Sequence, residues 1–181
     1  MKRKLIFSFL AAFFLCLPLS VAAQKQNGHA KQHKSVKKEL CLQLYSVRDL
    51  VHDINKDGKA EARWTSLLSR LHAMGYTSVE AAWYDQEHGT FYNRKAKDFK
   101  ADIEKAGMKV LSSHVNHGLT AEELASGDFT KALGWWKKCI ADHKAAGMSY
   151  IVNPWIGLQK SIHDLDVYCR YLNAIGKMCK E

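Results

Sequence analysis

Two side chains that could take part in chemistry follow short apolar runs: Glu80 in TSVEAAWY and His114 in VLSSHVNH. A carboxylate there could bind a ligand hydroxyl group or a metal ion, and a neutral imidazole could donate to a ligand oxygen or coordinate a metal. The structural alternative is a Glu80 paired with a neighbouring base. Glu is rarely buried without a task or a partner, and the imidazole of His114 can serve a ligand or a metal. We therefore select Glu80 and His114 as candidate catalytic residues. His117, in the loop beyond, is more typical of a solvated side chain.

Two further pairs of residues close apolar runs and are candidates for substrate binding. Tyr45 and Arg48 end the run LCLQLYSV and could hold hydroxyl groups or a phosphate. Asn153 and Trp155 end the run YIVNPW, where an aromatic face could stack on a ligand ring. For Trp155 the alternative is packing against the adjacent loop. We assign no metal ligand. No cysteine shows the close paired spacing of a zinc site, and His29 and His33, which are four residues apart, lie in a tail that offers no other ligand.

A repeated phrase predicts the elements that must position these residues. AMGYTSVEAAWY, KAGMKVLSSH and AAGMSYIVNPW each place a glycine between an amphipathic stretch and an apolar run. Gly75, Gly107 and Gly147 therefore read as helix C-caps that lead directly into buried strands. The predicted strands are 40–47, 76–83, 109–114 and 150–153, and the predicted helices begin near 64, 96, 129 and 165.

Strands that alternate with long amphipathic helices predict a parallel sheet with right-handed crossovers. The predicted fold class is α/β, of the (β/α)8 TIM-barrel type, with about four N-terminal βα units in residues 39–181. A full barrel needs about 250 residues. The rival is a doubly wound open sheet, which usually has a glycine-rich turn after its first strand, whereas LCLQLYSV is followed by RDLVHD.

Residues 1–38 are predicted to lie outside this fold. Residues 1–23 have a basic start, an apolar run and the small residues VAA, which is the pattern of a secretory signal peptide. Residues 24–38 hold five Lys and no acid and are predicted to be a basic disordered linker. Of the 27 Lys and Arg, three lie in 1–23 and five in 24–38, which leaves 19 against 18 Asp and Glu. We therefore expect a periplasmic or secreted protein with a near-neutral body, no nucleic-acid partner and no stable membrane anchor after cleavage.

The order of motifs also resembles a known family. LQLYSVRD, MGYTSVEAAWY, FYNRKAKDFKADIEKAGMKVLSSHV, YIVNPWIG and LDVYCRYLNAIGKMCKE are similar to segments of the xylose-isomerase-like TIM barrels. That family includes the sugar phosphate isomerases/epimerases and is related to the metal-dependent AP endonucleases of family 2. The resemblance covers nearly all of residues 40–181. It implies an enzyme in which a divalent metal (Mn, Mg or Zn) and carboxylates move a proton between adjacent carbons of a sugar through an enediolate.

The chain departs from the family pattern in one respect. In the sugar-epimerase branch the metal-binding Glu, Asp and His come mainly from later strands, and the sequence stops after its fourth helix. We therefore expect the metal only in the complete protein, and an inactive fragment here. The alternative is a noncatalytic carbohydrate-binding or structural relative. An AP-endonuclease-like nuclease is a third, less favoured reading. A half barrel that pairs with a second copy, and hence a homo-oligomer, also stays open.

Overall fold

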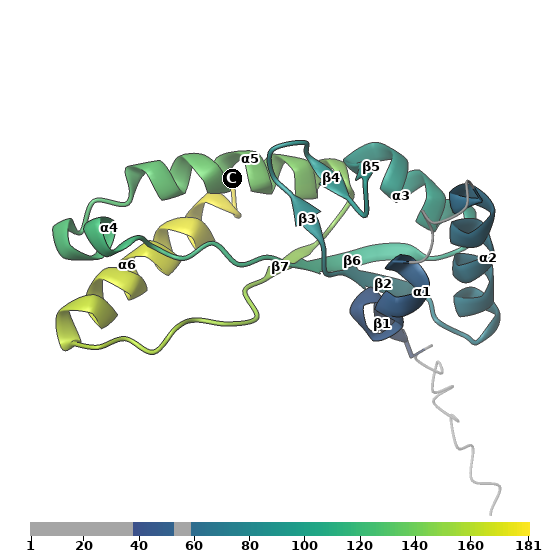
Figure 1. The fold of residues 1–181 in the computed structure, drawn as a ribbon, viewed down its shortest axis with the longest axis horizontal. Coiled ribbons are helices and arrows are strands. Elements are labelled where there is room, and N and C mark those ends of the chain that lie inside the picture. The colour runs from purple at the N-terminus through teal and green to yellow at the C-terminus, as the bar shows by residue number, and fades with distance from the viewer. Residues whose placement is uncertain (1–37, 53–58) are drawn as a thin grey trace, which may run out of the picture. The chain divides into compact units, whose positions relative to one another are not determined.

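The computed structural model describes residues 38–52 and 59–181, and these belong to one compact unit, residues 37–181. The predicted signal peptide and nearly all of the predicted linker lie outside the described residues. Four parallel strands form the main sheet in the order β1-β2-β6-β7 (Figure 1). Their bounds are β1 Cys41–Gln43, β2 Ser78–Ala81, β6 Lys109–His114 and β7 Tyr150–Val152. The predicted α/β class with parallel strands is confirmed.

Helices follow the strands, as the repeated phrase predicts. The long helices are α2 Ala60–Ala73, α3 Ala96–Lys105, α5 Thr130–Ala145 and α6 Ile162–Met178. Gly75, Gly107 and Gly147 all have positive φ directly after a helix. At the first of them the Gly75 N–H donates to His72 O and the Tyr76 N–H to Leu71 O, which is the Schellman pattern of a helix end. The three predicted helix–strand joints are therefore confirmed.

The first strand is shorter than predicted. It ends at Gln43, and the chain continues as a 3₁₀ helix η1 Leu44–Val47 and a helix α1 Arg48–His52. The turn buries Leu44 completely and leaves Tyr45 half-exposed. An apolar run does not distinguish these outcomes, because a buried turn and a buried strand both need apolar residues. The prediction that the strand extends to residue 47 is wrong.

Between β2 and α3 lies a small antiparallel sheet that the sequence analysis did not predict. Its strands are β3 Tyr84–Asp85, β4 Thr90–Phe91 and β5 Arg94–Lys95. Tyr92 and Asn93 form the two-residue turn between β4 and β5, with φ of 51° and 62°. Strands of two residues are too short to show an alternating pattern, which explains the omission. The short helix α4 Ala121–Ser126 was also missed, although Thr120 and Glu123 form a capping box there.

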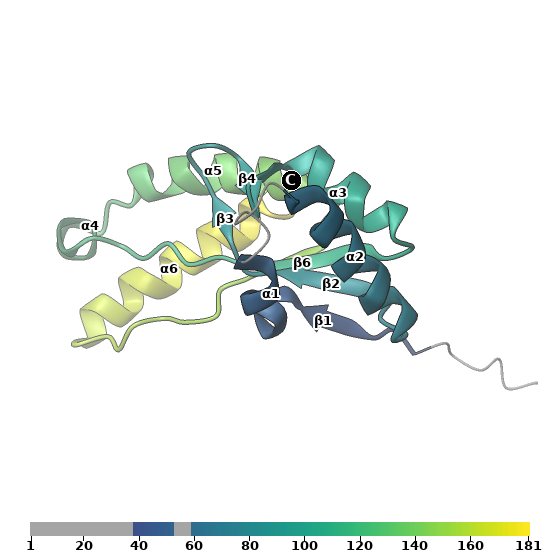
Figure 2. The same cartoon turned by 45° about the vertical axis from the view of Figure 1, so that its right-hand side comes forward.

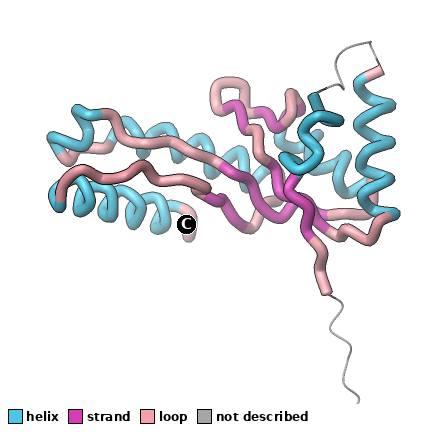
Figure 3. Tube along the Cα trace, turned by 60° about the horizontal axis from the view of Figure 1, so that its bottom comes forward, coloured by secondary structure: helices cyan, strands magenta, loops and turns pink. Residues whose placement is uncertain are grey.

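Apolar side chains gather in two clusters within the described residues. One lies between the main sheet, α2 and α3, and includes Trp64, Val79 and Phe99. The other lies between α5 and α6 and includes Trp136 and Tyr171. Figure 2 shows α2 and α3 beside β2 and β6, and α6 alongside α5. Long loops lead from β6 to α4 and from β7 to α6 (Figure 3). No described helix is long and apolar enough to cross a membrane.

Candidate functional site

The carboxyl ends of three neighbouring strands bring together a polar cluster of Gln43, Glu80, Ser112 and His114. Gln43 on β1 is in register with Glu80 on β2, and Glu80 with Ser112 on β6. The register of β2 and β6 shifts after Val79, so that Leu111 is an extra residue on β6. This β-bulge turns Ser112 and His114 to the same face as Glu80, whereas Val79 and Val110 face the core.

Both oxygens of Glu80 accept short hydrogen bonds. The Gln43 Nε2 donates to Oε1 and the Ser112 Oγ donates to Oε2, each at 2.6 Å. His114 Nε2 lies 3.1 Å from Glu80 Oε1 and 2.9 Å from Gln43 Nε2. A neutral imidazole with its proton on Nδ1 accepts from Gln43, while a protonated one donates to Glu80. The cluster can therefore hold a fixed carboxylate and a proton-binding imidazole side by side.

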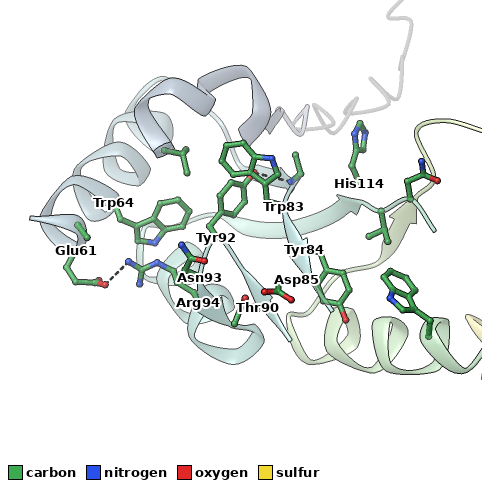
Figure 4. A pocket seen from close by; sticks show the side chains of 16 residues that line it. Glu61, Trp64, Trp83, Tyr84, Asp85, Thr90, Tyr92, Asn93, Arg94 and His114 are labelled. Atoms are coloured by element: carbon green, nitrogen blue, oxygen red, sulfur yellow. Dashed lines mark hydrogen bonds and ion pairs between the residues drawn. The ribbon is translucent and has the colours of Figure 1, made fainter. Parts of the chain in front are cut away.

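His114 connects this cluster to a cavity. The Glu80 and His114 side chains are 17% and 29% exposed, so both are reachable from solvent. His114 lines a cavity of 540 Å³, which is within the size range of small-molecule sites. The lining comes from α1, α2, the small antiparallel sheet and the segments that follow β2 and β6 (Figure 4). The cavity lies at the carboxyl ends of parallel strands, where barrel enzymes form their sites.

Aromatic rings form one wall of this cavity. The Tyr92 ring centroid lies 5.1 Å from that of Trp83 and 5.9 Å from that of Trp64. Figure 4 shows these three rings next to one another. The Tyr92 hydroxyl accepts a hydrogen bond from the Ala82 N–H at 3.0 Å, and burial raises the pKa of this hydroxyl. A bulky residue at φ 51° is strained, and its neighbours hold it in place. This wall is therefore preformed.

A second aromatic contribution comes from α5. Trp135 lines the cavity, and the His117 ring stacks on it with centroids 4.2 Å apart and planes 2° from parallel. Burial lowers the pKa of His117. Tyr171 donates to the His117 carbonyl at 2.7 Å and so ties this loop to α6. Trp135 is partly buried and also packs against the cluster between α5 and α6, in which the neighbouring Trp136 is buried.

Of the six candidate residues, His114 lines the cavity, Glu80 contacts it through His114, and the other four do not line it. The Tyr45 ring meets Trp83 edge-on at 6.4 Å, so Tyr45 abuts the aromatic wall from outside. Arg48 lies over the Tyr45 ring at 4.7 Å and donates to the Tyr45 carbonyl. Asn153 follows β7 and accepts from the Trp155 N–H at 3.4 Å, and Trp155 is 66% exposed. The structure thus brings Glu80 and His114 together, with Tyr45 and Arg48 nearby.

Sequence reasoning missed Gln43, Ser112, Trp83 and Trp135. Gln43 had a signal, because it is the single amide in the apolar run LCLQLYSV. Trp83 also had one, since it is the last residue of the predicted strand that carries Glu80. Ser112 had none, because its orientation depends on the bulge at Leu111.

The described residues do not complete a metal site. Glu80 and His114 could supply two ligands. Among the residues that the structure describes, however, no group of three or more His, Cys, Asp and Glu could hold a metal ion. Most protein metal sites need three or four such ligands, so we derive no chemical step through a metal from this chain.

Comparison with known proteins places this geometry in a family context. No family model and no curated protein matches the sequence. Two crystal structures of sugar phosphate isomerases/epimerases from Parabacteroides distasonis are similar. One is 28% identical in sequence with a TM-score of 0.64, and the match covers 82% of this chain and 49% of the chain in that crystal structure. The other has 25% identity and a TM-score of 0.62 over 79% and 50%. A xylose isomerase domain-containing protein from Salmonella typhimurium is more distant, at 14% identity and a TM-score of 0.46.

The fold is therefore of the TIM-barrel type, matched over about half of a barrel. Within that class, the chain is similar to two solved sugar phosphate isomerases/epimerases, in agreement with the resemblance of its motifs. The chain spans about half the length of the solved structures that it matches.

Proposed function

We propose that this chain binds a sugar or sugar derivative and forms the substrate-orienting half of an isomerase or epimerase site. Glu80 accepts hydrogen bonds from substrate hydroxyls, His114 exchanges donor and acceptor roles with them, and neither side chain transfers the proton between carbons. The observation that carries the proposal is the fixed Glu80 carboxylate, held at 2.6 Å on both oxygens and in contact with His114 at the cavity. Preorganised groups of this kind bind without reorganisation.

The chemistry that completes the reaction belongs to the complete protein under this proposal. A divalent metal would polarise substrate oxygens there, and further carboxylates would act as acid and base. Glu80 and His114 of this chain keep the sugar in one orientation relative to those groups. We further propose export to the periplasm or beyond, on the basis of the signal-like residues 1–23. The 181-residue chain alone should then show no metal-dependent isomerase or epimerase turnover, and a chelator-sensitive turnover would contradict this division of roles.

Sugar binding by the chain tests the assignment of Glu80 and His114. Isothermal titration with D-xylose, D-glucose and D-fructose should show binding that Glu80→Gln and His114→Ala each weaken about tenfold to a hundredfold. That range corresponds to the loss of a hydrogen bond to a charged or polar group, about 1.5–3 kcal/mol. Glu104→Gln is the matched control, because Glu104 is exposed on α3 and only faces Lys100 at 3.7 Å. Equal affinities for the wild type and both site variants would refute the assignment.

A further inference from the structure

The charge of the cavity lining is informative about the ligand. Of the described residues that line the cavity, Glu61 and Asp85 carry carboxylates and Arg94 carries a guanidinium. One positive and two negative groups leave a balance of −1 with His114 neutral. Glu80, in contact with His114 at 3.1 Å, adds a further carboxylate beside the cavity. The described lining is therefore negative.

Arg94 is already engaged on three sides. Its Nη2 is 2.7 Å from Glu61 Oε1, and its Nη1 is 2.7 Å from Asp102 Oδ2. The guanidinium also lies over the Trp64 ring, 5.1 Å from its centroid. The side chain is 16% exposed. A ligand phosphate would have to displace one of these carboxylates to form a bidentate pair with Arg94, so this cation does not offer a phosphate site.

The amino end of α2 also contacts the cavity, through Ala60 and Glu61. The first turn of a helix attracts anions, but Glu61 places a carboxylate in that turn. Asp85, elsewhere in the lining, accepts from His88 Nδ1 at 2.7 Å, and this hydrogen bond holds the pKa of Asp85 below its ordinary value. Asp85 is thus ionised at neutral pH. Both carboxylates would repel a bound anion.

The remaining lining suits a neutral polyhydroxylated ring. The wall of Trp64, Tyr92 and Trp83 offers flat aromatic faces, against which the C–H face of a sugar can pack. Carboxylates beside an aromatic wall accept hydrogen bonds from several hydroxyl groups at once. Asn93, at φ 62°, adds an amide at the edge of the cavity.

We propose that this cavity takes an uncharged monosaccharide or polyol and discriminates against the phosphorylated form. This inference rests on the proposed function, because it assumes that the site binds a sugar. It differs from what the names of the similar crystal structures suggest for those proteins, and it follows from the engaged Arg94 and the carboxylates of Glu61 and Asp85.

The experiment compares each sugar with its own phosphate. The wild-type chain is titrated calorimetrically with D-glucose and D-glucose 6-phosphate, and with D-fructose and D-fructose 6-phosphate. We expect each neutral sugar to bind at least about tenfold more tightly. Asp85→Asn removes one repulsive charge. The ratio of the affinity for the neutral sugar to the affinity for its phosphate should therefore fall by about threefold to fivefold, chiefly because the phosphate binds more tightly. Asp98→Asn, exposed in the first turn of α3 and outside the cavity lining, should leave the ratio unchanged.

The outcomes separate the two proposals. Equal or tighter binding of the phosphates would overturn the inference and leave sugar binding intact. An affinity ratio of neutral to phosphorylated sugar that is the same in Asp85→Asn and the wild type would also overturn the inference, because the charge of the lining would then not cause the preference. Binding of neither form would refute the proposed function, and the inference with it. Retained preference for neutral sugars in Glu80→Gln and His114→Ala, at wild-type affinity, would refute only the roles of those two residues.

Discussion

His143 makes stability depend on pH in a way that one substitution can isolate. Its ring is 2% exposed on α5, with Phe91 and Tyr84 ring centroids 4.9 Å and 4.8 Å away. Nδ1 lies 2.7 Å from the Cys139 carbonyl, and Nε2 has no hydrogen-bond partner among the described atoms. Burial lowers the pKa of His143 from 6.5 to about 4. The folded protein thus keeps this imidazole neutral at a pH at which the unfolded chain protonates it.

A histidine whose pKa is lower in the folded state stabilises the fold when the pH is above its pKa in the unfolded chain. This stabilisation is lost as the pH falls toward the pKa of the folded state. With pKa values of 6.5 unfolded and about 4 folded, the contribution of His143 to the free energy of unfolding should fall by about 2 kcal/mol between pH 7 and pH 5. His143→Leu removes the titration and one unpartnered buried nitrogen. The stability of the wild type relative to His143→Leu should therefore drop by about 2 kcal/mol over that interval.

Urea unfolding followed by tryptophan fluorescence measures both proteins at pH 7 and pH 5. Carboxylates and other histidines titrate in both, so the difference between the two proteins isolates His143. His163→Leu is the control, because it replaces a histidine on the exposed start of α6 instead of a buried one. A wild-type minus His143→Leu difference that is equal at both pH values would refute the reasoning.

Three further predictions concern the backbone, association and processing. Gly107→Ala should lower the free energy of unfolding measured in urea by about 1–2 kcal/mol, because φ is 84° and the His72 ring lies 3.0 Å from the added Cβ. Gly134→Ala is the control: it lies mid-helix with open space around it and should be neutral or stabilising. Among the described residues β1 and β7 each pair on one side only, so light scattering should show a dimer or larger species, and a monodisperse, cooperatively unfolding monomer would contradict this. Mass spectrometry of exported protein should show a chain beginning at Gln24, and an intact Met1 in a cytoplasmic pool would exclude the signal peptide.

The sequence predicted those parts of the fold that local chemistry determines. The glycines at positions 75, 107 and 147 are informative because positive φ after a helix is costly for other residues, and all three joints form where expected. The strand at 109–114 has the predicted bounds. The end of β1 was not predictable, because Leu44 satisfies the apolar pattern in a buried turn as well as in a strand.

The candidate site divides in the same way. Glu80 and His114 could be expected to meet, because both were placed at the ends of neighbouring parallel strands. The means by which they meet could not be read from the sequence, because an extra residue at Leu111 decides which face His114 occupies. The cavity depends on the three two-residue strands that follow β2, and strands this short show no alternating pattern in the sequence.

The polar cluster is difficult to explain by stability alone. The interior of a TIM barrel is normally packed with branched apolar side chains, yet Gln43, Glu80 and Ser112 occupy one level of this sheet. A half-buried carboxylate loses hydration, and apolar residues of similar size would often stabilise a fold as well or better. Here every partner of Glu80 donates to it or can donate to it, so its direction is fixed toward His114 and the cavity. The core next to this level is apolar, whereas the level itself holds three polar side chains. This contrast indicates that the polar residues were selected for a site and not for stability.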